Sequence, residues 1–193
     1  MTLLHVSKCL PGGQGLAPAL VRRAATVELD WDVRQKSRFD CTDSSGRALG
    51  VFLPRGTAAR GGDVLVAEDG SLVRVIAAPQ PVLVITTCPQ HGTPFDLTRA
   101  AYHLGNRHVP IELRPEHLKI EPDHVLADML RAMHLIVIET RDTFEPEGGA
   151  YGGGHGGHGH GHAHSHEGHS HSHGHTHGHS HDHDHGHGHD HDH

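Results

Sequence analysis

The sequence predicts an α+β protein in three parts: a small all-β domain over residues 1–78, a ferredoxin-like βαββαβ domain over residues 79–147, and a disordered histidine-rich tail over residues 148–193. Three observations support this division. Short β-rich segments separated by turn residues fill the first part. The second part alternates strand-like runs with two segments of helical periodicity. The third contains 19 of the chain's 26 histidines and almost nothing apolar, so no core can offset the entropy lost on folding.

Short apolar runs predict strands throughout the first part. Asp, Ser and Gly in residues 42–47 and the Glu-Asp-Gly of residues 68–70 suit hairpin turns. The longest run, residues 20–29, is rich in Val, Ala and Thr and is expected to be one long strand. Turns about every ten residues favour a β-sandwich or a β-barrel. The expected strands are residues 3–6, 20–29, 37–41, 48–53, 64–67 and 72–77.

The second part begins after a stiff Ala-Pro-Gln-Pro break at residues 78–81. Thr93 and Pro94 form an N-cap followed by proline at the first helical position, and Gly105 is expected to end that helix in the left-handed conformation. Pro122 and Asp123 start a second helix. Strands are expected at residues 82–86, 109–113, 117–120 and 135–140. The predicted apolar helix faces are Leu97, Ala100, Ala101 and Leu104, and then Val125, Leu126, Met129, Leu130 and Met133.

Charge and composition exclude several classes of protein. Residues 1–147 carry 16 basic and 18 acidic side chains, a net charge of −2, and the tail carries the other −5. A nearly neutral body argues against a nucleic-acid-binding surface. No run approaches the ~20 apolar residues of a membrane span, and the first residues lack the pattern of a signal peptide. Three cysteines without a CxxC motif argue against a disulfide framework, so we expect a cytoplasmic protein that contacts neither membrane nor nucleic acid.

The tail has the chemistry of a chelator. Its histidines mostly alternate with Gly, Ser and Asp, and neutral imidazole suits Ni²⁺, Cu²⁺, Zn²⁺ and Co²⁺. Short flexible spacers let neighbouring imidazoles reach one ion at little entropic cost, so we expect several weakly held, rapidly exchanging ions. The tail does not select the metal. Two other interpretations of the tail are an expression tag and a solubilising segment without a metal role. The first expected ligands are His155, His158, His160, His162, His164 and His166.

Two histidines of the body stand in favourable positions. His108 follows the first helix and precedes a strand, so it is expected to be exposed and held on one side. His124 lies in the first turn of the second helix, and Asp128 one turn later could be an orienting carboxylate or an ordinary contact. Cys88 and His91 have C-x-x-H spacing, which we interpret as a surface loop because a closed zinc site needs four ligands.

The motifs of catalysis are missing from the sequence. There is no P-loop, GxGxxG, nucleophile elbow or HExxH, and Ser, Asp and Glu have no recognisable catalytic spacing. We therefore do not expect an enzyme.

Three segments together resemble a known family. Residues 102–111, YHLGNRHVPI, are similar to the signature of the urease accessory protein UreE, a family of nickel metallochaperones. Residues 123–133, DHVLADMLRAM, look like the second helix of that family. Residues 144–151, FEPEGGAY, followed by the histidine-rich tail, look like its C-terminus. The resemblance covers the whole chain, including the order of the domains.

The resemblance implies a homodimer formed through the second domain. In that family the histidine matching His108 lies on the two-fold axis and binds nickel with its symmetry mate. The first domain is thought to bind a partner protein, and nickel passes to the urease apoprotein through an accessory GTPase. His124 matches a histidine of a secondary metal site. Some members have another histidine two positions earlier, where this chain has Pro122, so the second imidazole of that site is missing here.

Two hypotheses follow. The first is a nickel chaperone for urease assembly, which needs His108 in its motif and the tail. The second is a histidine-rich buffer that stores or detoxifies metal without delivering it, which needs only the tail. The two hypotheses differ in whether urease activation at limiting nickel depends on the protein.

Metal uptake by the tail should weaken in acid. A free imidazole is protonated below pH ~6.5 and then cannot bind a metal ion. A Ni²⁺ titration of the chain should therefore show falling affinity between pH 8 and about 5.5. Uptake independent of pH over that range would contradict ligation by neutral imidazole.

Overall fold

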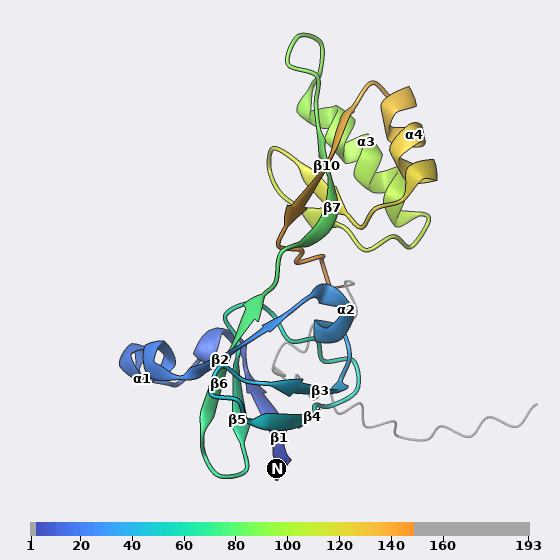
Figure 1. Cartoon of the computed structure of the whole chain (residues 1–193). Coiled ribbons are helices and arrows are strands. Elements are labelled where there is room, and N and C mark those ends of the chain that lie inside the picture. The colour runs from blue at the N-terminus through green and yellow to red at the C-terminus, as the bar shows by residue number, and fades with distance from the viewer. Residues whose placement is uncertain (1–2, 149–193) are drawn as a thin grey trace, which may run out of the picture. The chain divides into compact units, whose positions relative to one another are not determined.

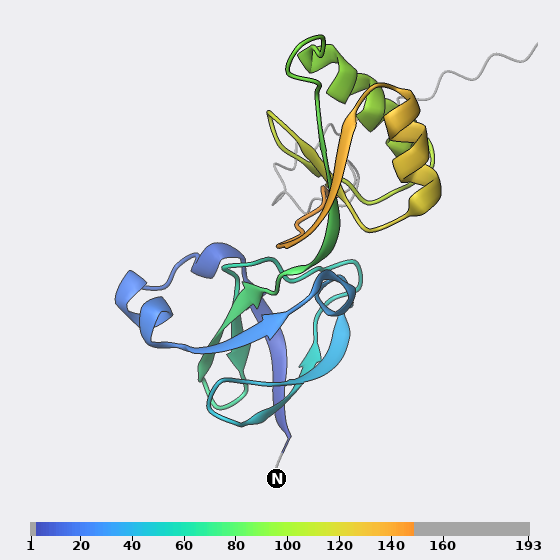
Figure 2. The same ribbon diagram turned by 45° about the horizontal axis from the view of Figure 1, so that its top comes forward.

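The computed structural model describes residues 3–148, whose strands form two sheets (Figures 1 and 2). The first sheet has six strands in the order β2-β6-β5-β1-β4-β3 and curls into a nearly closed, barrel-like form. Its strands are β1 (Leu4–Leu10), β2 (Ala25–Leu29), β3 (Arg38–Thr42), β4 (Ala48–Phe52), β5 (Val64–Ala67) and β6 (Leu72–Ala77).

The pairing of these strands is mixed. β1 runs parallel to β4 and antiparallel to β5, and β2 runs parallel to β6. Both hairpins expected from the turn residues are present, because β3 pairs with β4 and β5 with β6 in antiparallel register. Apolar side chains from alternate strand positions fill the interior, including Val6, Val27, Leu49, Val51, Leu65, Val73 and Val75.

The expected all-β first domain was wrong in part. Residues 20–29 are not one strand: helix α1 (Pro18–Arg23) occupies the first half, and β2 begins only at Ala25. Pro18 stands at the start of α1, where its fixed φ favours a helical turn. Val21 packs against Gly13, where an added Cβ would lie 3.0 Å from a Val21 methyl group. A short 3₁₀ turn η1 (Pro11–Gly13) and a one-turn helix α2 (Trp31–Arg34) also interrupt the strands.

The second sheet confirms the expected order β-α-β-β-α-β. Its strands lie in the order β10-β7-β9-β8, and two helices cover one face (Figure 2). The elements are β7 (Gln80–Thr86), α3 (Pro94–Gly105), β8 (Glu112–Leu113), β9 (Leu118–Ile120), α4 (His124–Ala132) and β10 (Ile136–Asp142). Helices and sheet share a core that includes Leu83, Ile85, Leu97, Leu104, Ile120 and Leu130.

The helices start where capping chemistry predicts. The Asp96 carboxylate accepts hydrogen bonds from Thr93 N and Oγ1 at 2.8 and 3.0 Å, and the Asp123 carboxylate accepts from two amides of the first turn of α4. Two expectations were wrong. Only Glu112 and Leu113 join β8, since Pro110 lacks the N–H that a longer ladder needs. Val125 is 62% exposed and does not belong to the core.

The expected disordered tail lies outside the described residues, apart from Gly148. Within residues 3–148, no helix is long and apolar enough to cross a membrane.

A buried arginine ties the segment after β10 to the first sheet. Arg34 is fully buried, and its guanidinium donates to Phe144 O at 2.7 Å, Glu145 Oε1 at 2.8 Å and Leu29 O at 3.0 Å. Trp31 packs edge-on against Phe144, with ring centroids 6.3 Å apart. Arg60 adds a 2.6 Å hydrogen bond to Pro146 O. Because a buried charge needs its partners, the path of residues 144–146 is fixed by Arg34.

Removing this arginine should be costly. Arg34→Leu leaves the Phe144 carbonyl without its donor and Glu145 without its shortest ion pair, so we expect a loss of about 3–5 kcal/mol in the free energy of unfolding. Urea denaturation measures it. Arg55→Leu, at an exposed arginine, is the matched control and should change stability by less than about 0.5 kcal/mol. Equal denaturation midpoints for the two variants would contradict the role assigned to Arg34.

Candidate metal centre

Helix α3 ends in a turn that presents His108. Val109 N donates to Leu104 O at 3.3 Å and His108 N donates to Gly105 O at 2.9 Å, which is the hydrogen-bond pattern of a Schellman motif. His108 itself has φ 56° and is the left-handed residue of the motif. The expectation that Gly105 would take this role was wrong, because the helical hydrogen bonds continue past Gly105 through Asn106 N to Tyr102 O.

The turn fixes the backbone of His108 while its side chain stays exposed. Leu104 before the turn and Val109 after it pack in the core shared by the second sheet and its helices, and these contacts hold the turn in place. A residue with a Cβ pays about 1 kcal/mol for left-handed backbone, and glycine is the usual choice. Histidine tolerates this region better than most residues, but glycine would cost less. A histidine at such an exposed position therefore indicates a role for its imidazole.

Neighbouring side chains give His108 no second ligand. Arg107, the preceding residue, donates from Nη1 to His103 O at 3.1 Å, and Tyr102 packs edge-on against the His103 ring with centroids 5.4 Å apart. Among residues 3–148, no three His, Cys, Asp or Glu side chains gather closely enough to hold a metal ion. A single imidazole supplies one coordination position, so any ion bound here must take its other ligands from elsewhere.

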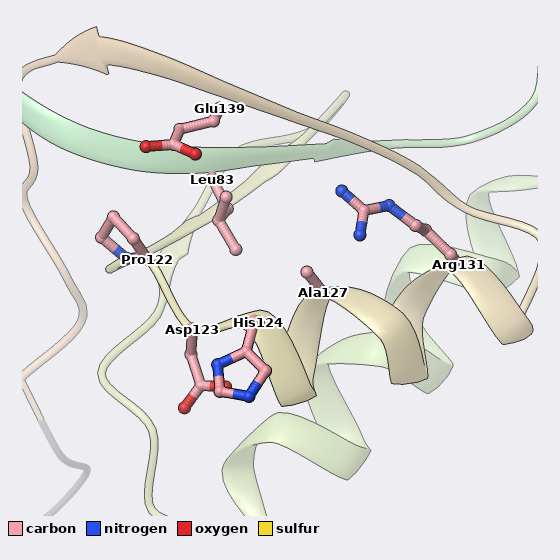
Figure 3. A pocket seen from close by; sticks show the side chains of 7 residues that line it. All are labelled: Leu83, Pro122, Asp123, His124, Ala127, Arg131 and Glu139. Carbon is pink, nitrogen blue, oxygen red and sulfur yellow. The ribbon is translucent and has the colours of Figure 1, made fainter.

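His124 lies at the start of α4, whereas His108 follows the end of α3. It is the first residue of α4 and lines an open pocket of about 400 Å³ (Figure 3). Figure 3 shows its ring beside Asp123, with Glu139 of β10 and Arg131 of α4 facing the same hollow. The other lining residues are Leu83, Pro122 and Ala127.

Asp123 and Asp128, the two carboxylates nearest to His124 in the chain, have other partners. Asp123 Oδ1 caps α4 by accepting from Val125 N and Leu126 N at 2.8 and 2.9 Å. Asp128, which could have oriented the imidazole, instead accepts from Arg131 Nη1 at 3.0 Å. Of the two readings left open for Asp128, the orienting carboxylate therefore has no support, and His108 and His124 are not brought into one cluster.

The remaining expected ligands are those of the tail, and His155, His158, His160, His162, His164 and His166 lie outside the described residues. The Cys88 and His91 pair was interpreted as a surface loop, and the structure does place it in a turn before α3. However, Cys88 Sγ lies 3.8 Å from His91 Nδ1. His134, which was not among the expected ligands, lines two pockets together with Cys88 and His91. Its position directly after an amphipathic helix, where glycine is usual, was the available signal.

Family models match nearly the whole chain. The model of the N-terminal domain of the UreE urease accessory protein matches residues 6–78, and that of the C-terminal domain matches residues 80–193. The urease accessory protein UreE of Polaromonas sp. strain JS666 is 79% identical over 155 residues, covering 80% of this chain and 70% of the relative. That of Paracidovorax citrulli is 79% identical over 154 residues, covering 79% and 73%. That of Burkholderia vietnamiensis is 54% identical over 140 residues, covering 72% and 68%.

Glycine at position 108 should suit the backbone better than histidine does. His108→Gly relieves about 1 kcal/mol of left-handed strain but adds freedom to the unfolded chain, so we expect a net gain of about 0.5 kcal/mol in unfolding free energy. Thermal and urea unfolding with a chelator present measure it without a metal contribution. His103→Gly, inside α3, is the control and should lose about 1 kcal/mol. A loss of stability in His108→Gly as large as in His103→Gly would show that the histidine is kept for packing.

Proposed function

This chain belongs to the UreE urease accessory protein family, and from that premise we propose that it is a cytoplasmic nickel metallochaperone that delivers Ni²⁺ to apo-urease. It acts as a homodimer, with the urease apoprotein and its accessory proteins, including the accessory GTPase, as partners, and it is not an enzyme. Its parts are a partner-binding domain over residues 1–78, a metal-binding and dimerisation domain over residues 79–147, and a metal-binding tail over residues 148–193. The observation that carries the proposal is the exposed, backbone-strained His108.

Two-fold symmetry supplies the second ligand that one chain lacks at His108. A dimer whose axis passes near the α3 turn presents two His108 imidazoles to one ion. Tyr102 supports this placement, because it lies on α3 six residues before His108 and 65% of it is exposed, and large exposed aromatic side chains are typical of interfaces. Imidazole is a borderline donor that suits Ni²⁺. Two ligands leave other positions open, and an open site suits a carrier that has to release its ion.

The start of the tail supports its role as a further ligand. Glu147 N donates to Ile111 O at 2.8 Å, so the last described residues lie beside a residue only three positions from His108. His155 is eight residues beyond Glu147, a span of at most about 28 Å when fully extended. Chain length therefore allows the first tail histidines to reach the His108 site, while the others recruit and buffer metal.

His124 is proposed as a secondary and weaker metal site. Its imidazole is exposed at the start of α4, and Glu139 lines the same pocket. Pro122 occupies the position where some family members have another histidine, so the second imidazole is missing. Glu139 is the side chain in this pocket that could replace it, because a carboxylate oxygen also binds divalent metals.

The tight site should depend on His108. In a chain truncated after Gly148, His108→Ala should weaken Ni²⁺ binding at least about tenfold, the equivalent of 1.4 kcal/mol for a lost ligand. Isothermal titration with Ni²⁺ measures it. His103→Ala, at the half-buried histidine five positions earlier in α3, is the control and should leave the affinity unchanged. Equal binding by the truncated chain with and without His108 would refute the proposed site.

Delivery separates this function from metal storage, the alternative that needs only the tail. Urease in cells lacking the protein should stay largely inactive at limiting nickel, and wild type should restore it. His108→Ala should restore it poorly, although its tail is intact. Normal urease activation without the protein would favour the storage buffer.

A further inference from the structure

Both helices of the second sheet end on a histidine in the left-handed conformation. At the end of α4, His134 N donates to Arg131 O at 2.9 Å and Leu135 N donates to Leu130 O at 3.2 Å, which repeats the motif that closes α3. His134 has φ 63° and is exposed. His108 and His134 are the two residues other than glycine with positive φ in the described part of the chain. His134 therefore bears the same backbone cost as His108, without a role assigned to its imidazole.

A tight turn before α3 folds a second imidazole onto a thiol. Gly92 N donates to Cys88 O at 2.7 Å, and a Cβ at Gly92 would lie 2.6 Å from both Cys88 N and Cys88 O. The turn in this form thus requires glycine at position 92. It brings His91 Nδ1 to 3.8 Å from Cys88 Sγ, on the surface of the molecule.

Cys88 differs in character from the other two cysteines. The hydrogen bond from the His91 side chain, together with backbone hydrogen bonds, lowers the pKa of the Cys88 thiol below its usual value. Burial raises the pKa of Cys9 to about 12 and that of Cys41 to about 11, and neighbouring aspartates add to both shifts. Thiolate is the form that binds metals, and Cys88 is the cysteine whose sulfur lies beside an imidazole, 3.8 Å from His91 Nδ1.

The turn and the end of α4 meet at one place. Two pockets of about 200 and 500 Å³ are each lined by Cys88, His91 and His134. Asp96 lines the smaller pocket, but its carboxylate is already bound to Thr93 N and Oγ1. The three side chains come from two separate segments of the chain and line the same pockets. They supply one soft donor, the thiol of Cys88, and two borderline donors, the imidazoles.

We propose that Cys88, His91 and His134 form a second metal site, which takes a borderline divalent ion such as Ni²⁺, Co²⁺ or Zn²⁺. The site is not yet closed, since no three such side chains in residues 3–148 lie close enough to enclose an ion. The exposed imidazole of His134 has to rotate toward the pair, and the thiol gives its proton to solvent as the metal–sulfur bond forms. A fourth position stays open to water or a tail imidazole, so the ion remains exchangeable.

This site is separate from the one proposed at His108. Cys88 and His91 precede the first residue of α3, whereas His108 follows its last turn. The twelve residues of α3 span about 18 Å. One ion cannot bridge that distance, so the two sites bind independently within one chain.

Cobalt binding to the full-length chain tests the proposal through its sulfur ligand. Thiolate-bound Co²⁺ absorbs strongly in the near ultraviolet by charge transfer, and the tail contributes nothing to that band because it contains no cysteine. The wild-type chain should show the band, and Cys88→Ser should abolish it. His134→Gly, which suits the left-handed backbone, should raise the Co²⁺ concentration at half-maximal absorption at least about tenfold.

Two controls decide the interpretation. Cys41→Ser removes a half-buried cysteine with a raised pKa and should leave the band intact. His108→Gly should also leave it intact, so the proposed function and this site fail separately. No band in the wild type, or a band that survives Cys88→Ser, would overturn the site. A band unchanged in His134→Gly would remove His134 from it and overturn the three-ligand proposal, since circular dichroism should show that this variant is folded.

Discussion

The fully buried guanidinium of Arg34 is the interaction on which the path of the chain's last described residues depends. A charge without access to water needs fixed partners on all sides, and Arg34 finds them in the carbonyl of Phe144, the carboxylate of Glu145 and the carbonyl of Leu29. Its partners lie 110 or more positions away in sequence, apart from Leu29 and Ala59. This one side chain thus joins the beginning of the fold to its end.

The same segment continues toward the candidate metal centre. Glu145 N donates to the buried carboxylate of Glu112 at 2.7 Å, and Glu147 N donates to Ile111 O at 2.8 Å. Glu112 also pairs with the buried Lys119 of β9. Residues 145–147, which precede the tail, are therefore hydrogen-bonded to Ile111 and Glu112, just after the His108 turn. In the proposed function, the folded residues position the metal and the 19 histidines beyond them supply the capacity for it.

Backbone strain and the proposed metal ligands coincide at the ends of α3 and α4. At both ends the Schellman hydrogen bonds would form at least as well with glycine, yet the chain has His108 and His134 there. A rigid turn with an exposed imidazole suits a ligand that must meet an ion from outside the domain. Among residues 3–148, neither end has the further His, Cys, Asp or Glu side chains close by that would enclose an ion.

Local chemistry was sufficient for much of this fold. Periodicity and capping residues placed α3, α4 and most strands, because those signals act within a few residues. The motif around His108 pointed to the family.

Tertiary structure decided the rest. Helix α1, whose Val21 packs on Gly13, occupies half of an expected strand. Hydrogen bonds from residues 106 and 109 back to α3 place the left-handed position at His108 and not at Gly105. The meeting of Cys88, His91 and His134, like the burial of Arg34, joins residues distant in sequence, and no local pattern records which distant residues will pack together.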